Sequence, residues 1–312
     1  MTRSFRALLT AGMIALASCS ASAVAATIAA AFSGSYTVTD LGSPFVVTPH
    51  GGLSFLPGDP NHVLLGGNAN AVGGAFYKLP LSRDSNCHVS GFLPAFAYGT
   101  VGEYNDGGVT FSPDRVLFST RFPRNELAQT RITSTDEDRV DDLDVHGVVT
   151  TISATGAVFV PGGFPGEGQL KLTELHGNWY TMPLVADGAG TFTPGTAVFH
   201  AALTGEPEAF AYVSGSNAVF GADSVIVAEY LTNNLATYTL DVDGNPVVAS
   251  RRLFASGLPG PIGLAVDPLT GDVLVSNISG SSIFRISGFV VPVVPEMIFT
   301  NGFDDLCAGA HL

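Results

Sequence analysis

Apolar and polar positions alternate in short runs along this chain, and a recurring block of such runs predicts repeated β-strands. Each block opens with a small residue and an apolar run that ends near a turn: GLSFLP (52–57), GVTFSP (108–113), GAVFVP (156–161), AFAYVS (209–214) and GLAVDP (263–268). Their starts are 56, 48, 53 and 54 residues apart. This spacing is too long for a hairpin and fits one four-stranded blade of a β-propeller.

Two further strand-like runs follow every opening. The second run is rich in branched residues, and the third alternates between apolar and polar positions, which predicts one packed and one solvated face. The second runs lie at 63–65, 116–118, 170–172, 225–227 and 273–275, and the third runs at 75–79, 127–132, 179–182, 235–240 and 282–286.

A fourth run completes only four of the five blocks, at 89–97, 140–148, 196–201 and 247–254. The last block lacks one because Gly288 ends it, whereas an unpaired strand-like run stands at 36–41. We therefore predict an all-β fold, a β-propeller of five four-stranded blades in which this N-terminal run is the outer strand of the last blade. Six blades are the alternative. Closure of this kind protects edge strands.

The small residue that opens each first strand suits the crowded centre of a propeller, where backbones approach closely. An apolar residue stands three positions later in every repeat and is predicted to pack between blades: Phe55, Phe111, Phe159, Tyr212 and Val266. The openings are thus packing positions, and function is expected in the loops beside them.

The chain of 312 residues divides into three parts. Arg3 and Arg6 precede an apolar run at 7–17, and small residues continue to Ala26, so residues 1–26 are predicted to be an export signal. Cleavage at 21–23 or 24–26 would release the protein into the periplasm or outside the cell, whereas LASC at 16–19 resembles a lipoprotein box and would anchor the chain at Cys19. The apolar run is too short for a transmembrane span. The propeller would occupy 36–289 and a tail 290–312.

Charge narrows the range of partners. Without the first 26 residues, which hold two basic and no acidic groups, 11 Lys and Arg face 27 Asp and Glu, a net charge of −16. Such a chain disfavours nucleic acid and anionic membrane surfaces. The acidity fits a soluble, exported monomer, and cation binding is the alternative reading.

Two cysteines remain in the exported chain, Cys87 and Cys307. Disulfides persist outside the cytosol, so a bridge between them is predicted, with two free thiols as the alternative. The bridge would tie the C-terminal tail to the first blade.

One stretch carries a family resemblance. LPGPIGLAVDP (258–268), continued by GDVLV (271–275), resembles an NHL-type or lactonase-type propeller repeat, and the segments 105–114, 164–172 and 178–180 resemble secreted bacterial propellers of uncharacterised function. The resemblance covers about 36–289. The tail departs from the membrane-sorting signal of such relatives, because residues 295–304 resemble a short IF-x-x-GF-[DE] ending of secreted proteobacterial proteins.

Candidate site residues gather where loops enter the first strands and leave the second strands. Three stand before first strands, His50, Asp106 and Glu208, and five follow second strands, Gly67, Thr120, Glu174, Glu229 and Asn277. At one channel mouth, His50, Asp106, Thr120 and Glu208 would bind a polar ligand, and Glu174, Glu229 and Asn277 would coordinate calcium. The lactonase-type resemblance implies a metal that polarises a substrate carbonyl. Alternatively, these side chains only satisfy strand ends and channel water.

No sequence motif identifies a catalytic centre. The chain has no G-x-S-x-G elbow, phosphate loop or dinucleotide fingerprint, and its seven histidines lack zinc-ligand spacing. The leading hypothesis is an exported binding module for an extracellular or cell-surface ligand. The alternative is a calcium-dependent lactonase-like or sugar-hydrolase-like enzyme built on Glu174, Glu229 and Asn277, and a third hypothesis is a structural protein of the cell envelope.

Overall fold

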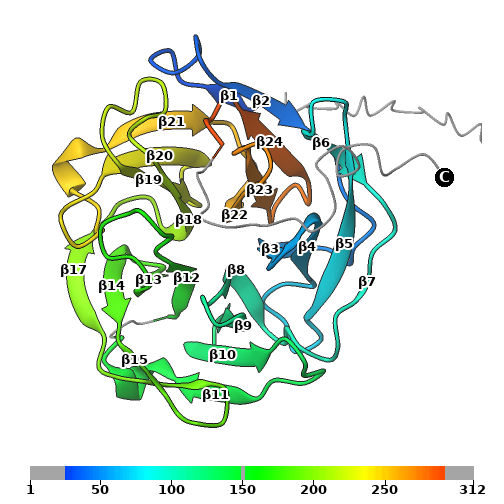
Figure 1. Ribbon diagram of the computed structural model, residues 1–312, viewed down its shortest axis with the longest axis vertical. Helices are drawn as coiled ribbons and strands as arrows, with labels where there is room; N and C mark the ends of the chain where they lie inside the picture. Colours follow the sequence, from blue (N-terminus) through cyan, green and yellow to red (C-terminus); the bar gives the residue numbers. More distant parts are fainter. Residues whose placement is uncertain (1–24, 149–151, 292–312) are drawn as a thin grey trace, which may run out of the picture.

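The computed structural model describes residues 25–148 and 152–291 and shows five antiparallel sheets arranged around one axis (Figure 1). The first blade contains β3 (His50–Leu56), β4 (Asp59–Gly67), β5 (Ala75–Arg83) and an outer edge divided into β6 (Val89–Phe92) and β7 (Phe96–Ala97). The second contains β8 (Asn105–Phe111), β9 (Val116–Arg121), β10 (Glu126–Arg131) and β11 (Arg139–Asp142). The predicted count of five blades is confirmed.

The remaining three blades follow the same order from the centre outward. The third contains β12 (Ala154–Phe159), β13 (Leu170–Glu174), β14 (Asn178–Met182) and β17 (Val198–Ala202), with a hairpin of β15 (Leu184–Ala186) and β16 (Phe192–Pro194) inserted. The fourth contains β18 (Pro207–Val213), β19 (Ser224–Glu229), β20 (Asn234–Thr239) and β21 (Arg252–Ser256). The fifth contains β22 (Pro261–Val266), β23 (Val273–Asn277) and β24 (Ile283–Ser287). Of two short 3-10 helices, η1 (Leu143–His146) follows the outer strand β11 and η2 (Val248–Ser250) precedes the outer strand β21.

The N-terminal segment closes the ring. Its strand β2 (Thr37–Asp40) pairs antiparallel with β24 and is the outer strand of the fifth blade, as the sequence predicts. A second short strand, β1 (Thr27–Ile28), was not predicted and pairs with β21 of the fourth blade. The same segment thus joins two blades, and Figure 1 shows β1 and β2 beside β21 and β24.

Five clusters of buried apolar side chains lie one at each blade–blade interface. The residues predicted to pack between blades are distributed one to each cluster: Phe55, Phe111, Phe159, Tyr212 and Val266. The core is therefore divided into wedges between sheets, which is how a propeller buries both faces of every blade.

The inner strands β3, β8, β12, β18 and β22 line the axis, and each contains an irregularity in its pairing at the same relative place. Near these irregularities, the backbones of the inner strands lie close together. A Cβ added to Gly107 of β8 would clash with the carbonyl oxygen of Ile262 in β22. Only glycine fits at such an approach, so the centre is closed by packed backbone at this level.

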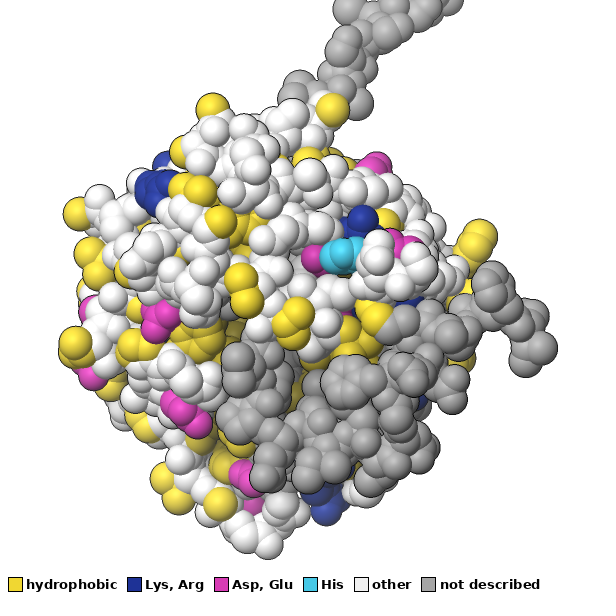
Figure 2. Space-filling model, turned by 45° about the horizontal axis from the view of Figure 1, so that its top comes forward, with side chains coloured by type: hydrophobic (Ala, Val, Ile, Leu, Met, Phe, Trp, Pro, Cys, Tyr) yellow, Lys and Arg dark blue, Asp and Glu magenta, His cyan; other side chains and the backbone are white. Residues whose placement is uncertain are grey.

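The surface in view is sparsely charged. Figure 2 shows acidic and basic side chains singly or in small groups, separated by apolar and neutral ones. In residues 25–148 and 152–291, no helix is long and apolar enough to cross a membrane.

Candidate functional site

Asp106 and Glu208 meet in the closed centre, near the end of the axis where the inner strands begin, which we call the entry end. Asp106 follows the first residue of β8 and Glu208 that of β18, and both are at most 4% exposed. A Cβ on Gly107 would lie 2.9 Å from Oε2 of Glu208, which places this carboxyl group against β8. The structure thus brings together two of the predicted ligand-binding residues.

The electrostatics of this pair favour protonated carboxyl groups. Burial raises the pKa of Asp106 to about 8, against hydrogen bonds from the Gly107 backbone and the Asn70 side chain that lower it. Burial, and then the charge of Asp106, raise the pKa of Glu208 well above its usual value. Two neighbouring carboxyl groups in a dry interior cannot both be ionised, so the pair retains a proton.

His50 begins β3 and is fully buried. Burial lowers its pKa, against a backbone contact with Val46 that raises it, so the imidazole is neutral near neutral pH. Asn105 Oδ1, Asp106 Oδ2 and Glu208 Oε2 are without partners in the described part of the chain. The entry end therefore holds several polar atoms without hydrogen-bond partners among the described residues.

Thr120 was predicted to be the counterpart of Glu174, Glu229 and Asn277 at the end of a second strand, but it lies one position before that place. The pairing of Asn105 with Arg121 makes Arg121 the counterpart of Glu174, Glu229 and Asn277. The Thr120 hydroxyl donates to the Thr155 carbonyl at 2.7 Å and so links the second blade to the third. Thr120 thus contributes to packing between blades.

Glu174 and Glu229 are turned back into their own blades. The Glu174 carboxylate accepts the backbone N–H groups of His176 and Asn178, each at 3.0 Å, and thereby closes the β13–β14 turn. Both carboxylate oxygens of Glu229 accept hydrogen bonds from the Arg251 guanidinium. These two carboxylates therefore do not converge on a shared ion.

The other proposed ligands lie apart from such a centre as well. The Asn277 amide donates to the carbonyls of Val275 and Ser282, each at 3.2 Å. Within residues 25–148 and 152–291, no group of three or more His, Cys, Asp or Glu side chains is placed to hold a metal ion. Of the predicted disulfide, Cys87 lies in the β5–β6 turn and Cys307 falls outside the described residues.

A pocket of about 370 Å³ opens at the opposite end of the axis, the exit end, where the inner strands finish. Three connections surround it: β12–β13, β18–β19 and β22–β23. Its volume lies within the range of small-molecule sites. Its lining is formed by Pro161, Gly162, Gly163, Phe164, Tyr212, Val213, Ser214, Ser216, Asn217, Asp223, Val266, Pro268, Gly271, Val273, Phe289, Val290 and Val291.

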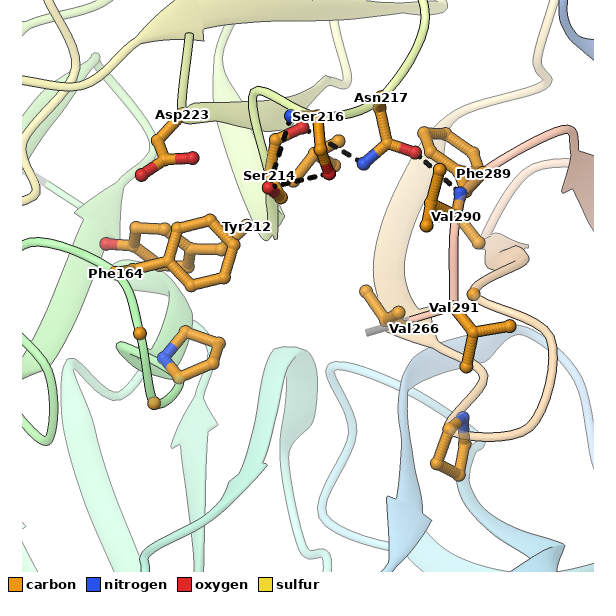
Figure 3. A pocket seen from close by; sticks show the side chains of 17 residues that line it. Phe164, Tyr212, Ser214, Ser216, Asn217, Asp223, Val266, Phe289, Val290 and Val291 are labelled. Carbon is orange, nitrogen blue, oxygen red and sulfur yellow. Dashed lines mark hydrogen bonds between the residues drawn. The ribbon is translucent and has the colours of Figure 1, made fainter. Parts of the chain in front are cut away.

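The two walls of this exit-end pocket come from distant parts of the chain (Figure 3). On one side, the rings of Phe164 and Tyr212 lie 5.5 Å apart at 59°, and the Tyr212 hydroxyl donates to the Gly244 carbonyl at 3.0 Å. On the other side stand Phe289, Val290 and Val291. Because the hydrogen bond to Gly244 fixes the Tyr212 ring, the aromatic wall is preformed.

The rim is polar and its loop is fixed by internal hydrogen bonds. Gly215 N–H donates to Asp223 Oδ1 at 2.8 Å, and the Asn217 amide donates to the Ser214 carbonyl at 3.0 Å. The Ser214 and Ser216 hydroxyls are 3.0 Å apart. An apolar interior with hydroxyl groups and one carboxylate at its edge suits an apolar or aromatic ligand that is neutral or cationic.

Sequence reasoning placed the candidate site at the entry end and missed this pocket. A signal was present in the third and fourth repeats, because the connections after β12 and β18 run for ten residues, 160–169 and 214–223, whereas Pro57 and Gly58 alone connect β3 to β4. Long loops in a compact domain are often functional. The contribution of Phe289 to Val291 had no comparable local signal.

Comparison with known proteins does not assign a family to this chain. No protein-family model and no curated protein matches the sequence. Among solved structures, glutaminyl cyclase from Myxococcus xanthus is 11% identical, with 86% of this chain and 97% of that chain covered and a TM-score of 0.48. The family AA12 enzyme from Trichoderma reesei is 9% identical, with coverages of 85% and 98% and a TM-score of 0.49.

A third neighbour is described as a binding protein. The auxiliary nutrient binding protein from Bacteroides ovatus is 8% identical, with 81% of this chain and 76% of that chain covered and a TM-score of 0.47. At such identities and scores, these neighbours do not bear on the activity of this chain. The five sheets themselves identify the chain as a β-propeller.

Proposed function

We propose that this protein is an exported β-propeller that binds a small apolar or aromatic ligand in the exit-end pocket. The observation that carries the proposal is the pocket of about 370 Å³ with a preformed aromatic wall and a polar rim. Export is proposed from the charged and apolar pattern of residues 1–26, which lie outside the description apart from Ala25 and Ala26.

The ligand class follows from the lining. Phe164, Tyr212 and Val266 offer apolar contact, and the Asp223 carboxylate is the charged group of the lining. The chain without its first 26 residues carries a net charge of −16, so an anionic ligand would be repelled. We therefore favour a neutral or cationic ligand with an apolar body.

The hydrolase alternative finds less support in the geometry. Its three proposed residues are committed elsewhere: Glu174 to a turn, Glu229 to Arg251, and Asn277 to backbone carbonyls. A carboxylate whose two oxygens both accept hydrogen bonds from a guanidinium has few lone pairs left for a cation. We therefore prefer the binding role.

A pocket-filling substitution tests the proposal. Ser216 is exposed and lines the pocket, so Ser216→Trp places a large ring in it without removing core contacts. Titration with the neutral dye Nile red, followed by fluorescence, should show saturable binding to the unmodified chain and at least about tenfold weaker binding to the variant.

The matched control is Ala218→Trp, an exposed position in the same loop that does not line the pocket. It should bind the dye as the unmodified chain does. Equal binding by all three proteins, or no saturable binding by any of them, would sink the proposal.

A further inference from the structure

The chain enters the exit-end pocket at its last described residues. Val290 N–H donates to Asn217 Oδ1 at 2.7 Å, and a Cβ on Gly271 would lie 2.7 Å from the Val290 carbonyl oxygen. The backbone is thus held between the β18–β19 loop and the β22–β23 turn, and Val291 beyond it still lines the pocket. Whatever follows Val291 starts at the pocket itself.

The sequence that follows is suited to an apolar groove. Residues 292–299 read PVVPEMIF, with two prolines, five other apolar residues and no basic residue. Prolines three positions apart favour an extended backbone without internal hydrogen bonds, and eight such residues span about 25 Å. An extended apolar segment in water gains free energy by covering an apolar surface.

We propose that residues 292–299 of this chain occupy the exit-end pocket and compete there with its ligand. The first half of this inference needs only the pocket, and the competition rests on the proposed function. The segment acts in cis, because it is attached at Val291 and its local concentration at the pocket is therefore high. Ligand binding requires its displacement.

The predicted disulfide would restrain the far end of this segment. Arg83 donates to the Cys87 carbonyl at 2.6 Å and pairs with Asp267 at 2.7 Å, which places the Cys87 turn beside the β22–β23 turn of the pocket. Fifteen residues lie between Val291 and Cys307, and this stretch can span up to about 50 Å. A bridge would hold the segment over the exit end while leaving it length to move.

Amide hydrogen exchange of the full chain tests the docking. We expect amides in 293–299 to exchange at least about tenfold more slowly than in the free peptide of the same sequence. A variant with Val293→Ser, Val294→Ser, Ile298→Ser and Phe299→Ser should lose this protection and also show faster exchange in the 214–223 loop. Asp304→Asn with Asp305→Asn is the control and should behave like the unmodified chain.

The pocket variants locate the docking site. Ser216→Trp should raise exchange in 293–299, and Ala218→Trp should leave it unchanged. Protection that survives Ser216→Trp, or that rises with protein concentration because the segment inserts into a second copy, would overturn the proposal. Free-peptide exchange rates in the unmodified chain would overturn it as well.

Nile red separates this inference from the proposed function. The fourfold serine variant should bind the dye at least about tenfold more tightly than the unmodified chain. Protected tail amides without dye binding in either protein would keep the docking and reject the ligand site. Equal dye binding by both proteins, with an unprotected tail, would keep the ligand site and reject the docking.

Discussion

Asp106 and Glu208 carry the most unusual chemistry of any residues at the entry end. Both are buried near the axis, where β8, β18 and β22 meet, and each leaves one carboxyl oxygen without a partner among the described residues. Burial is the main reason that the pKa of each group is raised. They are best understood as a pair that keeps a proton in the folded state.

This pair predicts a stability that depends on pH. The pKa of Asp106 is about 8 when folded against an ordinary 3.8, so its contribution is present in full below about pH 4 and is lost as pH rises through about 8. Thermal unfolding from about pH 5 to 9 should show the free energy of unfolding falling by up to about 1.4 kcal/mol per pH unit for each retained proton.

Asp106→Asn mimics the neutral carboxyl group and should flatten this dependence, while the exposed control Asp114→Asn should not. An unaltered slope in Asp106→Asn would show that the carboxyl group does not hold its proton.

At the scale of elements, the N-terminal segment does more than supply an outer strand. Between β1 and β2 the chain places Phe32 and Tyr36 in an aromatic group with Phe220 and Phe254 at the interface of the fourth and fifth blades. The alternating run at 36–41 predicted β2. Residues 27–32 carried no strand period, because β1 is only two residues long.

Removing the anchor of this segment should weaken ring closure. Phe32 is fully buried, with its ring centre 5.0 Å from that of Phe254, so Phe32→Ala should lower the free energy of unfolding by about 3 to 5 kcal/mol. Denaturant unfolding followed by circular dichroism measures this loss. Ser33→Ala, at an exposed neighbour, should change it by less than about 0.5 kcal/mol, and an equally small loss in Phe32→Ala would contradict the anchoring role.

At the scale of the whole molecule, five similar sheets produce two different ends. The entry end is crowded with strand starts and short contacts, whereas the exit end is widened by two ten-residue connections and reached by the end of the described chain. Cys87 lies near the exit end through the Arg83 contacts. The predicted bridge to Cys307 is therefore a feature of this end.

Peptide mapping without reduction tests the bridge. In protein exported to an oxidising compartment, a proteolytic fragment containing Cys87 should be linked to one containing Cys307, and reduction should lower the free energy of unfolding by several kcal/mol because the closed loop is about 220 residues long. Alkylation of both cysteines in the unreduced protein would show two free thiols instead.

The amino-acid sequence by itself determined the blades, their number, the packing residues and the closing strand, because these depend on strand period and repeat spacing within the chain. Candidate residues such as Asp106 and Glu208 could also be named, since their places in the repeats put them near the axis. The partners of these side chains could not be predicted. A shift of one position along a strand, as between Thr120 and Arg121, changes which side chain faces the channel.

Only the tertiary structure decided what those side chains do. Glu174 and Glu229 stand at predicted mouth positions, yet local hydrogen bonds and Arg251 turn them away, and no repeat pattern encodes a side-chain direction set by a distant partner. The pocket depends in the same way on three connections and Val291 meeting across more than a hundred residues of sequence. Such contacts arise when the ring closes, so they are a property of the fold and not of any one repeat.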